Sequence, residues 1–160
     1  MLYILGMLYT DLGNPDMSIT LLKQCIKLSP RHANAHVALG FAYMNSNDLK
    51  SAKECTSRAL KIVPNDPIAL RNLGGILGKE KDYLNAFYHL QKFYDINPHD
   101  LQTVYGLAFA YNSLNDFENA EKYVKALLDM HSPDTLKELA RGGQFWTGEN
   151  RGNFINQKFA

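Results

Sequence analysis

The sequence predicts an all-α protein built from consecutive pairs of antiparallel helices, and three observations indicate this. Pro30, Pro64 and Pro98 are equally spaced, although proline makes up only 6 of the 160 residues. Leucine, glycine, tyrosine and alanine residues also recur at this spacing, which we call the repeat step. Each set of residues that recurs in this way is called a column. Within each unit the apolar residues recur at the three- and four-residue spacing of helices. A period of about 34 residues that contains two helical stretches predicts a repeated helix–turn–helix.

The repeated columns keep one register through four units. They are Leu5-Gly6 with Leu39-Gly40, Leu73-Gly74 and Leu107-Ala108; Tyr9 with Tyr43, Leu77 and Tyr111; and Ser18 with Ala52, Ala86 and Ala120. Small residues on a buried helix face let two backbones approach closely, and larger neighbours fill the remaining space. These columns therefore predict where the two helices of each unit touch.

The register divides the chain into repeats of about 1–32, 33–66, 67–100 and 101–134, followed by a capping helix over 135–141. The second helices are expected to begin after Asn14-Pro15, Asn47-Asp48, Lys81-Asp82 and Asn115-Asp116. Asp66-Pro67 predicts an N-cap followed by proline at the first helical position, and Asp100 and Asp134 stand at equivalent steps. The turn of the second repeat is expected over 44–48.

The two ends depart from the repeat. The first helix begins at Met1 without an N-cap, so either its first turn frays or the chain was cut from a longer array. Leu136, Leu139 and Ala140 share one face of the predicted capping helix, which is degenerate after Arg141. Residues 142–160 are expected to form a tail or a degenerate fifth repeat, with aromatic side chains packing back onto the fourth repeat or belonging to a continuing array.

Composition excludes several classes of function. Seventeen basic and sixteen acidic side chains give a formal charge of +1, so no nucleic-acid partner is expected. No apolar run approaches the length that spans a bilayer, and the apolar start lacks the flanks of a signal peptide, so no membrane insertion is expected. Cys25 and Cys55 are expected to be reduced core thiols of a cytoplasmic protein.

No chemistry is expected from the remaining candidates. His32 and His36 are four residues apart, but they straddle the start of a helix and have no third ligand nearby, so His36 is expected to pack in the core. The glycine-rich stretch over 73–78 lies inside a helical pattern and lacks the lysine of a phosphate loop. We therefore expect no catalytic residue, no metal site, no cofactor and no enzymatic activity.

The repeated unit with its Leu-Gly, Tyr, Ala and Pro columns resembles the tetratricopeptide repeat family over residues 1 to about 134. The chain departs from the family where its early tryptophan is replaced by His36, Leu70 and Val104, and where the glycine of the interhelix turn survives only as Gly13. The resemblance implies a right-handed superhelical solenoid, in which the first helices line a concave surface that takes peptides or helices.

Mapped onto this chain, the resemblance implies a groove for a protein or peptide partner. Its predicted residues are Tyr3, Met7, Asn34, Phe41, Met44, Asn45, Arg71, Asn72, Gly75, Gly78, Gln102, Tyr105, Phe109 and Asn112. Val37 and Ile68 lie on the same stripe but are expected to contact neighbouring helices. Gly75 and Gly78 suggest a notch between Phe41/Met44 and Tyr105/Phe109 that receives a bulky apolar side chain.

The leading hypothesis is therefore an adaptor or scaffold that binds an apolar peptide or helix in this groove. Two alternatives stay open: a small secretion chaperone made only of such repeats, and a regulatory segment of a larger enzyme. A homodimer is also possible, because the end faces of such arrays often stack.

Overall fold

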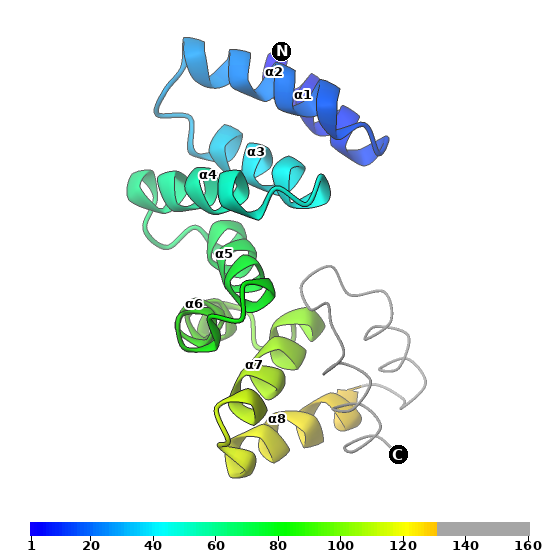
Figure 1. Ribbon diagram of the computed structural model, residues 1–160, viewed down its shortest axis with the longest axis vertical. Coiled ribbons are helices and arrows are strands. Elements are labelled where there is room, and N and C mark those ends of the chain that lie inside the picture. The colour runs from blue at the N-terminus through cyan, green and yellow to red at the C-terminus, as the bar shows by residue number, and fades with distance from the viewer. Residues whose placement is uncertain (131–160) are drawn as a thin grey trace. The chain divides into compact units, whose positions relative to one another are not determined.

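In the computed structural model, the structure describes residues 1–130, which form eight α-helices and no strand (Figure 1). The helices are α1 (Leu2–Asp11), α2 (Pro15–Leu28), α3 (Ala33–Asn45), α4 (Leu49–Ile62), α5 (Pro67–Lys79), α6 (Tyr83–Ile96), α7 (Leu101–Ser113) and α8 (Phe117–Met130). The predicted all-α fold of helix pairs is confirmed.

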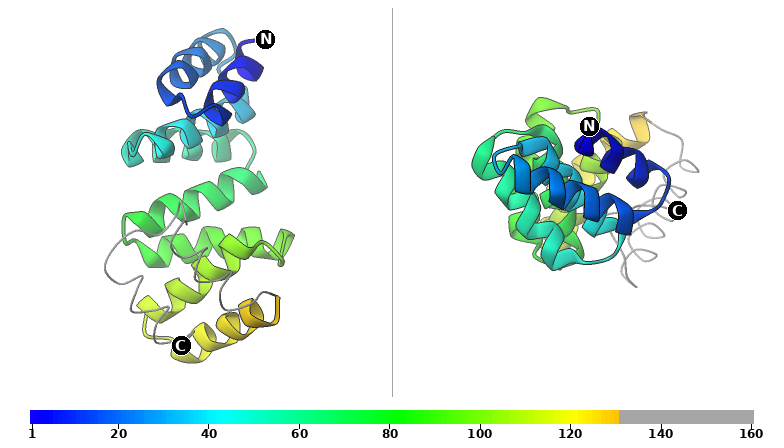
Figure 2. Two further views of the ribbon diagram at one scale, coloured as in Figure 1. Left: turned by 90° about the vertical axis from the view of Figure 1, so that its right-hand side faces the viewer. Right: turned by 90° about the horizontal axis from the view of Figure 1, so that it is seen from above.

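The chain divides into two compact units, Met1–Ile76 and Leu77–Ala160, and α5 runs through the boundary. In the first unit α1 packs against α2, α2 against α3, and α3 against α4 (Figure 2). In the second unit α6 packs against α7, and α7 against α8. Asp134, the predicted capping helix and residues 142–160 lie outside the described residues, and the predicted repeat boundaries stay predictions.

Side-chain caps explain where the helices begin. The side chain of Asp48 accepts a hydrogen bond from Ser51 N at 3.1 Å, and Asp82 and Asp116 cap the next second helices in the same way. Asp66 Oδ1 accepts from Ala69 N at 2.7 Å at the start of α5. Each cap satisfies a backbone N–H that has no partner within its helix. The N-caps predicted from sequence at Asp66 and Asp100 are confirmed, since Asp100 Oδ2 accepts from Thr103 N at 2.9 Å.

The turn between the two helices of a pair has the same geometry four times. Gly13, Asn47, Lys81 and Asn115, each one repeat step from the next, have φ values of 71°, 62°, 64° and 61°. In each turn the next N–H donates to the carbonyl five residues earlier, as from Asp48 N to Tyr43 O at 2.9 Å. This is a Schellman motif, which requires the left-handed backbone that glycine adopts most easily. Asn and Lys occupy that conformation in three of the four turns.

The small-residue columns mark the close contacts inside each pair. Gly40 of α3 lies against α4, where an added Cβ would overlap Thr56 Oγ1 and lie 3.2 Å from Ala52 O. Ala52 and Thr56 are fully buried, and the Thr56 hydroxyl donates to Ala52 O at 2.8 Å. The contact leaves no room for a side chain at position 40.

The core of the first unit forms where α2 and α3 meet. Leu22, Ala38, Leu39 and Ala42 are buried together, and Tyr43 packs against this cluster. The turn expected over 44–48 starts later than predicted, because α3 continues to Asn45 and buries Met44. The helix thus gains a further core side chain at its C-terminal end.

Candidate functional site

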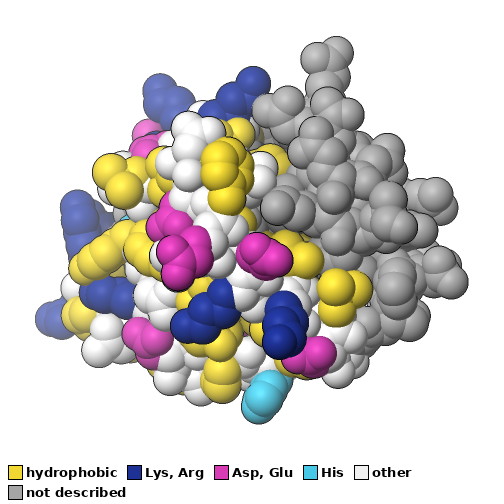
Figure 3. Space-filling model, turned by 90° about the horizontal axis from the view of Figure 1, so that it is seen from below, with side chains coloured by type: hydrophobic (Ala, Val, Ile, Leu, Met, Phe, Trp, Pro, Cys, Tyr) yellow, Lys and Arg dark blue, Asp and Glu magenta, His cyan; other side chains and the backbone are white. Residues whose placement is uncertain are grey.

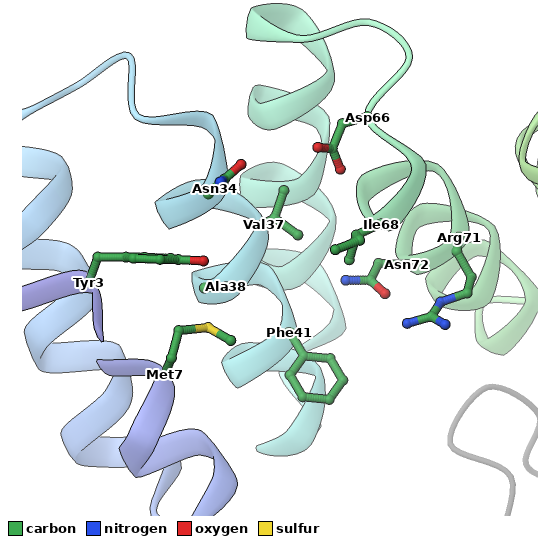
Figure 4. A pocket seen from close by; sticks show the side chains of 10 residues that line it. All are labelled: Tyr3, Met7, Asn34, Val37, Ala38, Phe41, Asp66, Ile68, Arg71 and Asn72. Atoms are coloured by element: carbon green, nitrogen blue, oxygen red, sulfur yellow. The ribbon is translucent and has the colours of Figure 1, made fainter. Parts of the chain in front are cut away.

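A cavity of about 370 Å³ opens in the first unit between α1, α3 and the start of α5 (Figure 4). It is lined by Tyr3, Met7, Asn34, Val37, Ala38, Phe41, Asp66, Ile68, Arg71 and Asn72. Six of these belong to the predicted groove: Tyr3, Met7, Asn34, Phe41, Arg71 and Asn72.

Helical spacing places the lining side chains of each helix on one face of that helix. Tyr3 and Met7 are four residues apart on α1, and Val37 and Phe41 are four apart on α3. Residues three or four apart on a helix lie on the same face. Tyr3, Val37 and Arg71 are each one repeat step apart, so three successive repeats contribute equivalent positions to the cavity.

Apolar side chains form most of the lining. Met7 and Phe41 are partly exposed and face the cavity from α1 and α3 (Figure 4). Val37 is buried with Ala59 and Ala69, so its predicted contact with neighbouring helices is confirmed. Ile68, for which the same contact is expected, is 53% exposed. Ile68 is the second residue of α5, and it leaves an apolar surface at the edge of the cavity.

Asn72 is the residue of the lining whose buried side chain has an unsatisfied oxygen. Its side chain is 2% exposed, and its Oδ1 has no hydrogen-bond partner among the described residues. Leaving a buried amide oxygen without a donor costs about 1–3 kcal/mol. Figure 4 shows the amide beside Ile68 in the cavity wall. The position can therefore accept a hydrogen bond from a bound N–H or O–H group.

The polar groups around the lining have mixed charge. Asp66 holds the N-terminus of α5 through Oδ1, and its carboxylate adjoins the cavity. Arg71, half-buried, contributes a guanidinium from the next turn of α5. The Tyr3 ring lies 5.1 Å from the His32 ring, measured between centroids. The cavity therefore offers acceptors and donors around an apolar centre, without a single dominant charge.

The remaining predicted groove residues lie elsewhere. Met44 is 4% exposed, and Tyr105 and Phe109 of α7 are 2% and 6% exposed. The Phe109 ring contacts the Tyr83 ring edge-on at 5.8 Å. The other predicted residues outside the cavity are Asn45, which is exposed, Gly75 and Gly78, which are buried, and Gln102 and Asn112, which are partly buried. The predicted notch stays a prediction.

Asp66 and Ala38 belong to the cavity but were not predicted as groove residues. Ala38 lies one repeat step before Asn72, so the repeat register carried a signal for it. The sequence predicts Asp66 only as an N-cap, and the structure shows that it both caps α5 and lines the cavity.

Both candidate metal-binding histidines have structural partners. His32 Nδ1 accepts from Ala35 N at 3.2 Å and caps α3. His36 is 7% exposed, and its Nε2 lies 2.9 Å from Pro30 O, so its predicted packing role is confirmed. Within residues 1–130, no group of three or more His, Cys, Asp or Glu side chains is placed to hold a metal ion.

Cysteine and surface charge complete the description. Cys25 is buried and Cys55 partly buried, and both are free thiols. Burial raises the pKa of the Cys55 thiol to about 11. On the face that Figure 3 shows, basic and acidic side chains are interspersed with hydrophobic ones. None of the helices in the described part of the chain is both long and apolar enough to cross a membrane.

Comparison with known proteins shows which proteins this chain is similar to. A family profile described as "Tetratricopeptide repeat" matches residues 9–74 and 79–136. The peroxisomal targeting signal receptor of Saccharomyces cerevisiae is 24% identical over 124 residues, which is 75% of this chain and 20% of the receptor. The type IV pilus assembly protein PilF of Pseudomonas aeruginosa is 30% identical over 86 residues, which is 54% of this chain and 34% of that protein.

A solved structure agrees in fold. MamA from Desulfovibrio magneticus superposes with a TM-score of 0.79 at 20% identity, over 98% of this chain and 92% of the MamA chain. The matched segments span about a third of the length of these two curated relatives or less. Because the profile covers most of the sequence in two stretches, this chain belongs to the tetratricopeptide repeat family.

Proposed function

We propose that this chain is a protein-interaction module that binds an apolar segment of a partner protein in the cavity of the first unit, and that it is not itself an enzyme. The observation that carries the proposal is the buried Oδ1 of Asn72, which lacks a donor in the wall of an apolar cavity. An unsatisfied buried polar group in a native structure calls for an explanation, and the one proposed here is a ligand that donates the missing hydrogen bond.

The lining suggests how a peptide is held. An aliphatic or aromatic side chain of the ligand packs against Met7, Phe41 and Ile68, and burying such a side chain contributes about 1.5–3 kcal/mol. A backbone N–H of the same ligand donates to Asn72 Oδ1. Asn34 and Arg71 provide polar contacts around the apolar centre. Pockets that combine apolar walls with a few placed polar groups are typical of ligand sites.

The family supports the class of ligand. Tetratricopeptide repeats generally mediate protein–protein interactions, and one relative is by name a receptor for a targeting signal. The nature of that signal is a property of the receptor and not of this chain.

Peptide selection followed by titration tests the proposal. A random peptide library is selected on the immobilised chain, and the best peptide is titrated by calorimetry against variants of the cavity. We expect Phe41→Ala and Asn72→Leu each to weaken binding by about tenfold or more, since each removes on the order of 1.4 kcal/mol. Tyr88→Ala serves as the matched control, because Tyr88 is 54% exposed on α6 and outside the cavity.

The stability of the same variants separates binding from folding. Asn72→Leu removes an unsatisfied buried polar group, so we expect its melting temperature to equal or exceed that of the wild type. Peptides that bind the wild type and the two cavity variants with equal affinity would show that the cavity is not the site.

A second reading is a regulatory segment of a larger protein, because this chain spans only a small part of its curated relatives. In this second reading the cavity also binds an apolar segment. That segment, however, belongs to the same larger polypeptide and not to a separate partner protein. Competition between the selected peptide and segments of the longer parent protein distinguishes the two.

A further inference from the structure

Phe41 presents an aromatic ring at the cavity that no other ring covers. Its side chain is partly exposed and reaches the cavity from α3 (Figure 4). Among the described residues, no ring contact involves Phe41. Aromatic rings prefer an edge-to-face or offset-stacked neighbour, and such a contact adds to the gain from burial alone. The ring of Phe41 therefore has an unused capacity for an aromatic contact.

The repeat register shows what such a ring contacts in another repeat of this chain. Phe109 stands two repeat steps after Phe41, and its ring meets the ring of Tyr83 edge-on, with 5.8 Å between the centroids. Phe109 is 6% exposed as a result of its surroundings, whereas Phe41 is partly exposed. The residue two repeat steps before Tyr83 is Pro15, which has no aromatic ring. In the first unit the chain itself thus supplies no counterpart of Tyr83.

Met7 adds a second group that favours an aromatic ligand. It stands one repeat step before Phe41, so the two residues occupy equivalent positions on α1 and α3. Figure 4 shows the Met7 thioether extending from α1 toward the side of the cavity on which Phe41 lies. A thioether sulfur makes favourable contacts with aromatic rings. Both residues therefore favour the same class of ligand side chain.

The size of the cavity limits what enters it. Its volume of about 370 Å³ is at the small end of the range of about 300–1,000 Å³ for pockets that hold a small molecule. One large side chain fits such a space, whereas a whole helix face does not.

The charges around the cavity select against a cationic side chain, although cations also bind aromatic faces. The guanidinium of Arg71 lines the cavity and repels a lysine or arginine of the ligand. Asp66, which carries the opposite charge, lies at the other end of the cavity from Phe41 in Figure 4. The ring of Phe41 is therefore better suited to a neutral aromatic side chain.

We propose that the partner segment enters the cavity with an aromatic side chain, whose ring packs against Phe41 and Met7. This inference rests on the proposed function, because it specifies the side chain that the cavity binds. An aliphatic side chain of the same size buries a similar apolar area but lacks the ring contact. Phe41 is then the residue that distinguishes an aromatic anchor from an aliphatic one, while Asn72 binds the ligand backbone in either case.

A pair of matched peptides tests the proposal. A peptide is first selected from a random library on the immobilised full chain, and it is kept only if Asn72→Leu weakens its binding. We expect such peptides to share an aromatic residue at one position. The best one is then synthesised with that residue and with cyclohexylalanine in its place, which is as bulky and apolar but has no aromatic ring. We expect cyclohexylalanine to weaken binding to the wild type about two- to tenfold in calorimetric titrations.

Removing the ring from the protein completes a double-mutant cycle. Phe41→Leu keeps an apolar side chain at this position, so we expect it to bind the two peptides within about twofold of each other. Tyr88→Leu is the matched control, because it removes a ring that is 54% exposed on α6, outside the cavity. That variant should distinguish the two peptides as the wild type does. The comparison on the wild type changes only the peptide, so it does not depend on the stability of any variant.

The outcomes separate the aromatic anchor from the proposed function. The aromatic anchor alone is overturned if peptides that depend on Asn72 share an aliphatic residue at one position, or if the cyclohexylalanine peptide binds the wild type as tightly as its parent. An aromatic preference that persists unchanged in Phe41→Leu would also overturn it. A library that yields no peptide whose binding depends on Asn72 would refute the proposed function, and the aromatic anchor with it.

Discussion

The contact between Gly40 and Thr56 allows a sharp test of how the helix pairs are held together. A Cβ at position 40 would overlap Thr56 Oγ1 and would lie 3.2 Å from Ala52 O and 3.4 Å from Thr56 N. The last two atoms belong to the backbone of α4, so they cannot rotate away. Gly40→Ala must therefore either displace the Thr56 hydroxyl or move α3 away from α4.

Three terms set the magnitude. Overpacking a buried contact costs about 1–3 kcal/mol. Displacing the Thr56 hydroxyl from Ala52 O loses a hydrogen bond of about 0.5–1.5 kcal/mol. Replacing a mid-helix glycine by alanine recovers about 0.5–1 kcal/mol of helix propensity. We expect Gly40→Ala to lower the free energy of unfolding by about 1–3 kcal/mol, with the melting temperature falling by about 2–4 °C for each kcal/mol.

A double-mutant cycle measured by urea unfolding isolates this contact. Thr56→Ala removes the hydroxyl that a Cβ at position 40 would overlap, and leaves only the backbone contacts of α4. We expect the double variant to be more stable than the sum of the two single changes by about 1 kcal/mol or more. The reasoning is refuted by a Gly40→Ala variant as stable as the wild type, or by single changes that simply add.

Three further predictions follow from buried or strained positions. Ala86→Leu, at a fully buried site of α6, is expected to cost about 1–3 kcal/mol of stability by overpacking, and an unchanged melting temperature would contradict the predicted register. Lys81→Gly is expected to raise stability by about 1 kcal/mol because it relieves a positive φ of 64°, whereas Asn115→Gly should gain less since asparagine tolerates this conformation. Burial, with a smaller contribution from Lys92, holds the pKa of His89 below its ordinary value of 6.5. The folded state therefore disfavours the imidazolium, so stability present above pH 6.5 is lost as the pH falls below it. Chemical denaturation at several pH values should show this loss in the wild type and a smaller one in His89→Gln.

Much of the fold could be predicted from the sequence because its signals are local and repeated. Asp48, Asp82 and Asp116 accept bonds from backbone N–H groups three residues later, and the sequence predicted that the second helices begin directly after these residues. The left-handed turns were less visible, since only Gly13 carries the expected residue. Asn47 and its equivalents adopt the same conformation because the Schellman bonds fix the turn.

The cavity could be predicted only in part. Periodicity specifies which residues share a helix face, but it does not specify whether a neighbouring helix covers that face. Phe41 and Met44 were therefore predicted together, whereas one lines the cavity and the other is buried. The unsatisfied oxygen of Asn72 depends on the positions of all surrounding groups, and no sequence pattern reports it.

The shared turn geometry also gives this chain a set of internal reporters of local opening. The amide protons of Asn14, Asp48, Asp82 and Asp116 each close an equivalent turn through a bond of 2.9 Å. Their hydrogen-exchange rates can therefore be compared directly, since the bond is the same and only the flanking residues differ. The exchange rate at each position reports how often the turn between the two helices opens locally. We expect the turn that contains Lys81 to open most often, because its backbone is strained.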